Sequence, residues 1–290
     1  MDTIPQHIRY RSERIAGRVK KLGRRCGEAS LHNLRVDIKK QRALYRLFRE
    51  ADPDFPYQKS FHRLKKIFAH AGIVREIHRQ TDLLQRESEV DAHFTRKYKR
   101  YLVNAYQLAR NDFRIHARDA GIPTWEELEE AIQQAISQCN QPTLTDYFEQ
   151  LSAQAHQIIH HIATCSNEEM HQLRKDIKDY EANRKISARY FGFDPGPLPG
   201  IQGDINALLD QLGIWHDYDR AWRRLQIDLA ATYWSSPDRQ AGKQLLLRWQ
   251  RKSRYLKRKL KNLSFAPPRF GHDPGSGAKD NTAKPEESYT

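Results

Sequence analysis

A short segment of this chain occurs twice. LHNLRVDIKK at 31–40 resembles MHQLRKDIKD at 170–179, an offset of 139 residues (170 − 31). A second pair, GIVRE at 72–76 and GIWHD at 213–217, follows at an offset of 141 residues (213 − 72). Two pairs of segments at nearly the same offset indicate one duplicated unit. We therefore expect two similar halves that place these segments in equivalent positions.

Apolar residues recur at helical spacing along nearly the whole chain, and no stretch alternates as a strand does. The spacing predicts helices near 6–23, 28–50, 57–86, 90–119, 124–138, 143–164, 167–190, 201–231 and 237–263. The predicted fold class is all-α, with two similar four-helix bundles joined by a bridging helix. The expected organisation is a first bundle over 1–122, a bridging helix and linker over 123–142, a second bundle over 143–265 and a disordered tail over 266–290.

The second predicted helix carries a straight row of cations. His32, Arg35, Lys39, Arg42 and Arg46 are spaced 3, 4, 3 and 4 residues apart. On a helix this spacing forms one row about 21 Å long. Neighbouring like charges at i,i+4 repel by a few tenths of a kcal/mol, and the row contains no acid. Together with a net charge of +14, the row predicts an extended anionic ligand.

The second repeat keeps the start of this row and adds a cation at its edge, in the residues His171, Arg174, Lys178 and Lys175. Glu181 takes the place of Arg42, so the second row is interrupted. We hypothesise that the first half holds the tighter part of the site. Further cations are expected to contribute from other helices: Lys66, Arg75, Arg251, Arg254 and Arg258.

The two motifs together resemble the CHAD family, the conserved-histidine α-helical domain, over roughly residues 10–263. His32, Arg35, Lys39 and Arg42 fit the first motif, and His171, Arg174 and Lys178 repeat it. The GIWHD segment fits the second motif, whereas GIVRE departs from it because Glu76 stands where the family usually has Asp. The resemblance implies two four-helix bundles related by a pseudo-two-fold axis, with a basic central channel. It also implies binding of inorganic polyphosphate and an association with polyphosphate granules.

Polyphosphate is a chain of charges without bases, so its recognition requires repeated donors along a groove. Arginine offers bidentate geometry to phosphate oxygens, lysine acts as a point charge, and protonated histidine donates from both nitrogens. We therefore expect non-enzymatic polyphosphate binding, with no catalytic residue, metal or cofactor. We also hypothesise that His32 and His171 increase the affinity as the pH falls. His216, in the second motif, completes the candidate site.

Two other functions remain open. The positive charge alone suits non-specific nucleic-acid binding, although no helix-turn-helix, zinc finger or RNP motif occurs. An HD-like metal-dependent phosphohydrolase would use His216 and Asp217, with His171 and Asp219 beside them. The first repeat carries Arg75 and Glu76 at the positions of His216 and Asp217, and arginine is not a metal ligand.

The remaining features concern metal binding and location. His156, His160 and His161 include an i,i+4 pair without an evident third ligand, which we interpret as a surface cluster. The three cysteines lack metal-type spacing, which fits a reducing compartment. No apolar run reaches about 18 residues, so no membrane span is predicted. The expected location is the cytoplasm.

Overall fold

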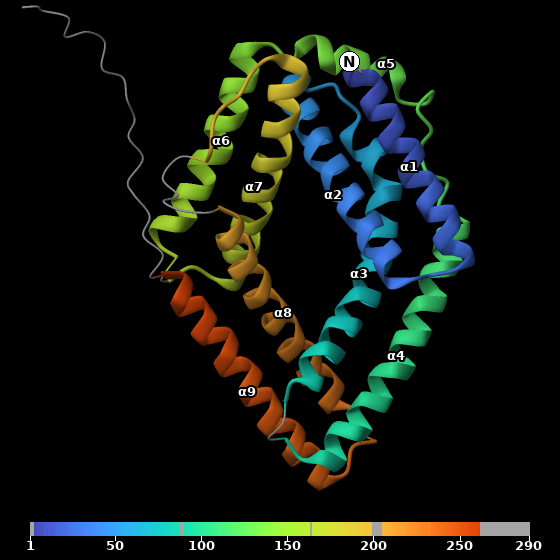
Figure 1. The fold of residues 1–290 in the computed structure, drawn as a ribbon, viewed down its shortest axis with the longest axis vertical. Coiled ribbons are helices and arrows are strands. Elements are labelled where there is room, and N and C mark those ends of the chain that lie inside the picture. The colour runs from blue at the N-terminus through green and yellow to red at the C-terminus, as the bar shows by residue number, and fades with distance from the viewer. Residues whose placement is uncertain (1–2, 88–89, 163, 199–204, 232, 262–290) are drawn as a thin grey trace, which may run out of the picture.

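The protein is all-helical in its computed structural model, which describes residues 3–87, 90–162, 164–198, 205–231 and 233–261. Within these residues no strand occurs, so the all-α fold class is confirmed (Figure 1). The helices are α1 (Ile4–Arg24), α2 (Glu28–Ala51), α3 (Tyr57–Gln85), α4 (Ala92–Arg118), α5 (Glu129–Gln138), α6 (Gln141–His160), α7 (Asn167–Ile186), α8 (Ile205–Ala230) and α9 (Ser236–Lys261). A π-helical turn, Ser187–Phe191, continues α7.

Local side-chain caps explain where several helices begin. Thr3 and Ser166 each form a capping box with the residue three positions later, at the starts of α1 and α7. Asp91 and Asn140 cap α4 and α6 through their side-chain oxygens. The predicted bridging helix is shorter than expected. Its helical hydrogen bonding begins at Glu129, although the Thr124 hydroxyl accepts a hydrogen bond from the Glu127 amide.

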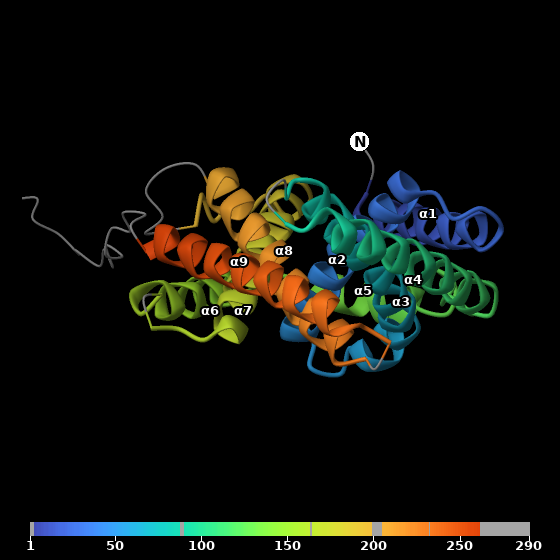
Figure 2. The ribbon, with the colours of Figure 1, turned by 90° about the horizontal axis from the view of Figure 1, so that it is seen from below.

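Four helices form the centre of the molecule. Helix α2 packs against α7, and α3 packs against α8, so the two inner helices of one half face those of the other (Figure 1). Helices α1 and α4 cover the outer side of the first pair, and α6 and α9 cover the outer side of the second (Figures 1 and 2). Helix α5 packs against α2. The repeated segments of the sequence lie on these inner helices.

The apolar side chains form two buried clusters, and each one combines both halves. The larger cluster includes Ile38 of α2 and Ile177 of α7, which are equivalent positions of the repeat and are fully buried. The smaller cluster joins the C-terminal parts of α3 and α8 to the N-terminal part of α4 and to α9, for example through Tyr98, Leu225 and Trp249. The expected boundaries at 122 and 143 therefore do not separate two hydrophobic cores.

The remaining predictions about the fold concern the tail, membrane spans and the duplication. The tail expected over 266–290 lies outside the described residues. None of the described helices combines the length and apolarity needed to cross a bilayer. The duplication into two four-helix bundles and the central channel remain predictions.

Candidate anion-binding site

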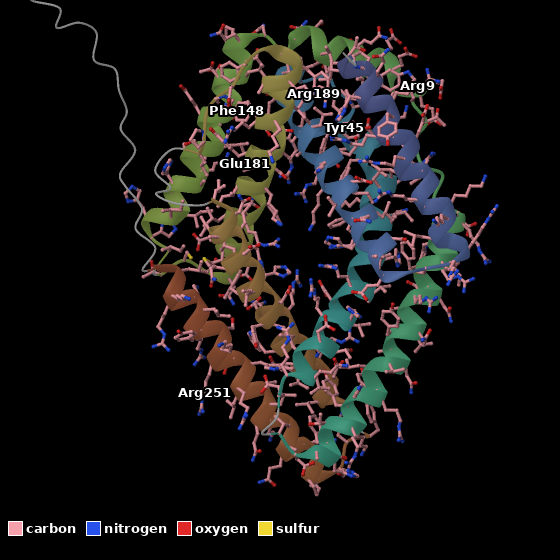
Figure 3. The ribbon with its side chains drawn as sticks, viewed as in Figure 1. Arg9, Tyr45, Phe148, Glu181, Arg189 and Arg251 are labelled. Atoms are coloured by element: carbon pink, nitrogen blue, oxygen red, sulfur yellow. The ribbon has the colours of Figure 1, made fainter. Side chains whose placement is uncertain are left out.

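Cations from both repeats meet where α2 faces α7. The pKa of Lys39 is lowered from 10.5 to about 7, first by burial and then by the charges of Arg35, Lys178 and Arg174. The pKa of Lys178 is lowered to about 8 by burial, by Arg174 and by Arg75 of α3. We call Arg35, Lys39, Arg75, Arg174 and Lys178 the central basic cluster. In Figure 3, side chains with nitrogen ends project into the space between the inner helices.

Carboxylates act on the central basic cluster only from longer range, among them Asp210 and Asp217 on Lys178. Among the described residues, none of its five members forms an ion pair within 4.0 Å. Glu76 and Asp217 act on Arg35 and Arg174 only at longer range, and burial still lowers the pKa of both arginines. The cluster therefore holds an excess of partly buried positive charge, which an anion would stabilise.

In each repeat, the arginine of the first motif lies over the glycine of the second. A Cβ atom on Gly72 would lie 2.9 Å from Nη1 of Arg35, and one on Gly213 would lie 3.7 Å from Nη2 of Arg174. The Arg35 guanidinium also donates a hydrogen bond to the Phe68 carbonyl at 2.5 Å and lies 3.9 Å from the centroid of the Phe68 ring. The missing side chain at Gly72 thus lets Arg35 reach the α3 backbone in a fixed orientation.

The two motif histidines have different surroundings. His32 is exposed, and its pKa is lowered by burial of part of its ring and by the neighbouring Arg75 and Lys39. His171 is half-buried, and its Nε2 lies 3.3 Å from Oδ2 of Asp219. The His171 ring also packs against the rings of Trp215 and His216, each with centroids 4.8 Å apart. His171 is therefore oriented by its own repeat, whereas His32 is surrounded by cations.

Asp219 is fully buried and already has several partners. Besides His171, it accepts a hydrogen bond from Nδ2 of Asn167 at 2.6 Å and pairs with Nε of Arg223 at 3.2 Å. The pKa of the neighbouring His216 is lowered mainly by burial, and its Nδ1 lies 3.7 Å from Asp217. These contacts occupy the carboxylate that a hydrolytic metal site in this half would need.

Two members of the predicted row have a structural partner. Arg42 and Arg46 both pair with Asp179 of α7, at 3.1 and 2.5 Å, and the Asp179 side chain is 3% exposed. These arginines therefore join α2 to α7, and their expected contribution to ligand binding stays a prediction. Asp179 was missed in the sequence, where the only signal is that it replaces the Lys40 of the first repeat.

The other predicted cations are exposed. Arg251, Arg254 and Arg258 are exposed on α9, which packs against α8 and α4, and Figure 3 shows Arg251 on the outer side of that helix. Lys66 and Lys175 are also exposed and are not among the main charges that lower the pKa of Lys39 or Lys178. These five exposed residues are therefore not counted in the central basic cluster, although Lys175 adjoins Arg174 in α7.

One further cation was missed by the sequence interpretation. Arg79 lies on α3 one turn after Arg75, where its charge lowers the pKa of both Arg75 and His32. Its Nε lies 3.9 Å from Asp217 of α8. The i,i+4 spacing from Arg75 was a usable signal for this residue.

The comparison with known families agrees with this geometry. The CHAD domain matches residues 9–226, which is most of the chain and includes both copies of both motifs. The chain therefore belongs to the CHAD family. The arginines of α9 lie beyond the matched residues. No curated protein and no solved structure matches the chain significantly.

Proposed function

We propose that this protein binds inorganic polyphosphate without catalysing a reaction on it, and that the central basic cluster is the core of the binding site. The observation that carries the proposal is the meeting of five unpaired cations from both repeats. Their positions fall within the region matched by the CHAD domain. A chain of phosphates would neutralise this charge, and no base-reading groups are required for its recognition.

The cations of the cluster are expected to contribute to binding in different ways. Arg35 is held in place by Phe68 and Gly72, so it presents its guanidinium at little entropic cost. Lys39 and Lys178 have lowered pKa values, and phosphate oxygens nearby would favour their protonated forms. Binding is therefore coupled to proton uptake near neutral pH. The proposed ligand path is the predicted basic channel between the two predicted four-helix bundles.

The two alternative functions are less well supported. An HD-like phosphohydrolase would draw on Asp219 as a metal ligand, and this buried carboxylate is already paired with the cation Arg223 as well as with His171 and Asn167. Weak, non-specific nucleic-acid binding is compatible with the charge of the chain. Such binding would use the exposed arginines of α9 as much as the central basic cluster. The position of the charges that contribute to binding therefore distinguishes the two functions.

Two variants that remove the same charge from different places test the proposal. One replaces Lys39, Arg174 and Lys178 by alanine, and the other replaces Arg251, Arg254 and Arg258. Affinity for long-chain polyphosphate is measured over a salt series, with duplex DNA as competitor. Because each charge-assisted contact contributes about 1 kcal/mol, we expect the central variant to bind about 100-fold more weakly. The α9 variant should stay within about threefold of the parent, since its charges act only at long range.

Two results would contradict the proposal. Equal losses in the two variants would indicate a generic basic surface, and displacement of polyphosphate by duplex DNA at matched phosphate concentration would favour nucleic acid. The proposed location is the cytoplasm, at polyphosphate granules. Imaging of a fluorescent fusion in cells with and without polyphosphate tests that location, and a distribution unaffected by polyphosphate would exclude it.

A further inference from the structure

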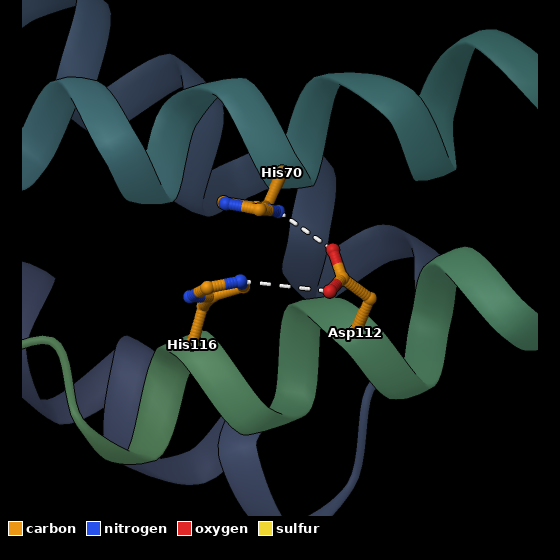
Figure 4. A group of neighbouring side chains, drawn as sticks. All are labelled: His70, Asp112 and His116. Carbon is orange, nitrogen blue, oxygen red and sulfur yellow. Dashed lines mark hydrogen bonds and ion pairs between the residues drawn. The ribbon is translucent and has the colours of Figure 1, made fainter.

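A cluster of potential metal ligands lies outside the central basic cluster, between α3 and α4. His70 comes from α3, and Asp112 and His116 come from α4 at i,i+4 (Figure 4). Nδ1 of His70 lies 2.7 Å from Oδ2 of Asp112, and Nε2 of His116 lies 3.5 Å from Oδ1 of the same carboxylate. Both rings therefore turn a nitrogen toward one carboxylate.

The two rings stack against each other. Their centroids are 3.8 Å apart with an interplanar angle of 25°. Two imidazolium rings at this distance repel, and one carboxylate compensates only one of the two charges. A divalent ion would bind both neutral imidazoles and the carboxylate together, once the rings have turned so that each points a nitrogen at the ion.

The distances permit coordination after small side-chain rotations. One donor atom from each of the three residues lies within 4.8 Å of the others. Zinc bonds of about 2.0–2.1 Å would place the donors of a tetrahedral ion about 3.3 Å apart. The side chains of His70, Asp112 and His116 are 25%, 49% and 50% exposed, so they have room to close that difference. Water has access to the remaining coordination position.

We propose that His70, Asp112 and His116 bind a divalent transition metal of the zinc class. Two imidazoles and one carboxylate suit Zn²⁺, Co²⁺, Ni²⁺ or Cu²⁺, whereas Mg²⁺ and Ca²⁺ prefer oxygen ligands. The ion links α3 to α4 and stabilises the folded chain, because the ligands are brought together only in that state. The three metal ligands lie outside the central basic cluster, so the metal proposal and the polyphosphate proposal can fail independently.

Titration with Co²⁺ tests the site. The full chain is freed of metal and of polyphosphate and titrated with Co²⁺, which is followed by its visible absorption and then displaced with Zn²⁺. The variants are His70→Ala and His116→Ala, and the matched control is His160→Ala, at an exposed histidine in the last turn of α6. The surface cluster expected at His156, His160 and His161 is corrected, because His156 is buried in the packing of α6. Far-ultraviolet circular dichroism checks that all four proteins are equally helical.

We expect one Co²⁺ per parent chain, at least a tenfold loss of affinity in His70→Ala and in His116→Ala, and no change in His160→Ala. Zn²⁺ should raise the melting temperature of the parent and of His160→Ala only. The proposal is overturned if all four proteins bind alike, if only His160→Ala loses the ion, or if the parent binds neither ion.

Discussion

The lysine at the centre of the basic cluster opposes folding, and its replacement tests this structure most directly. Burial and neighbouring cations lower the pKa of Lys39 from 10.5 to about 7. The folded state therefore binds fewer protons here than the unfolded chain does between these two pH values. As the pH falls from 10.5 toward 7, the folded state loses stability by linkage. We expect Lys39→Met, which retains the aliphatic length, to stabilise the protein at neutral pH.

The two pKa values determine the size of this effect. By linkage, the stabilisation is at most about 4 kcal/mol at pH 7 and about 2 kcal/mol at pH 9. Relaxation around the partly exposed ammonium reduces both stabilisation energies, but the stabilisation at pH 7 stays larger than that at pH 9. Polyphosphate affinity should change in the opposite direction. The loss of one charge-assisted contact of about 1 kcal/mol weakens binding about fivefold at pH 7.

Urea unfolding at pH 7 and pH 9, followed by circular dichroism, measures the free energies of unfolding. Lys40→Met is the matched control, because Lys40 is the next residue of α2 and is exposed. Its free energy of unfolding should stay within about 0.5 kcal/mol of the parent at both pH values. Destabilisation by Lys39→Met would refute the reasoning. An equal gain at both pH values would also refute it, since that result would indicate packing rather than ionisation.

Two further predictions compare equivalent positions of the repeat. Gly72→Ala should displace Arg35 and weaken polyphosphate binding, because the new Cβ would lie 2.9 Å from that guanidinium. Gly213→Ala has ordinary contacts at 3.7 Å and should raise the free energy of unfolding by about 1 kcal/mol through helix stability. Equal polyphosphate affinities and equal unfolding free energies of the two variants would contradict this prediction. Burial raises the pKa of Asp176 to about 6, so Asp176→Asn should raise the unfolding free energy by about 3 kcal/mol at pH 8 and by less than about 1 kcal/mol near pH 4. Asp37→Asn should instead lower it by about 1–3 kcal/mol, because Asp37 pairs with two arginines of α1; urea titrations that rank the two variants in the other order would exclude this account.

The helices were predictable because their signals are local. Apolar spacing acts within a few residues, so the predicted ends of α2 and α3 lie within a residue of those observed, although neither helix begins with a side-chain cap. The start of α5 was misplaced because a hydroxyl–amide contact at Thr124 occurs in a turn before the helix. The relation between the hydrophobic clusters was not predictable, since apolar spacing shows that a face is buried without showing which helix covers it.

The candidate site divides in the same way. The motif row correctly indicated Arg35, Lys39, Arg174 and Lys178 as neighbours on their own helices, although it did not show that the two pairs face each other. The row also overestimated its own length, because Arg42 and Arg46 meet Asp179 more than 130 residues away in the chain. A pattern read along one helix contains no information about an acid on another.

The sequence by itself determined the all-helical fold, the two repeated motifs and the cationic rows on α2 and α7, because periodicity and repetition are properties of the chain alone. Tertiary structure decided which cations remain unpaired. The packing of α2 on α7 neutralises one end of the row through Asp179 and brings Lys39 beside Lys178 and Arg174. The packing of α9 against α8 and α4 leaves the arginines of α9 exposed. Charge in a row is therefore a local property, whereas an unneutralised cluster depends on the burial and partners that only the folded chain provides.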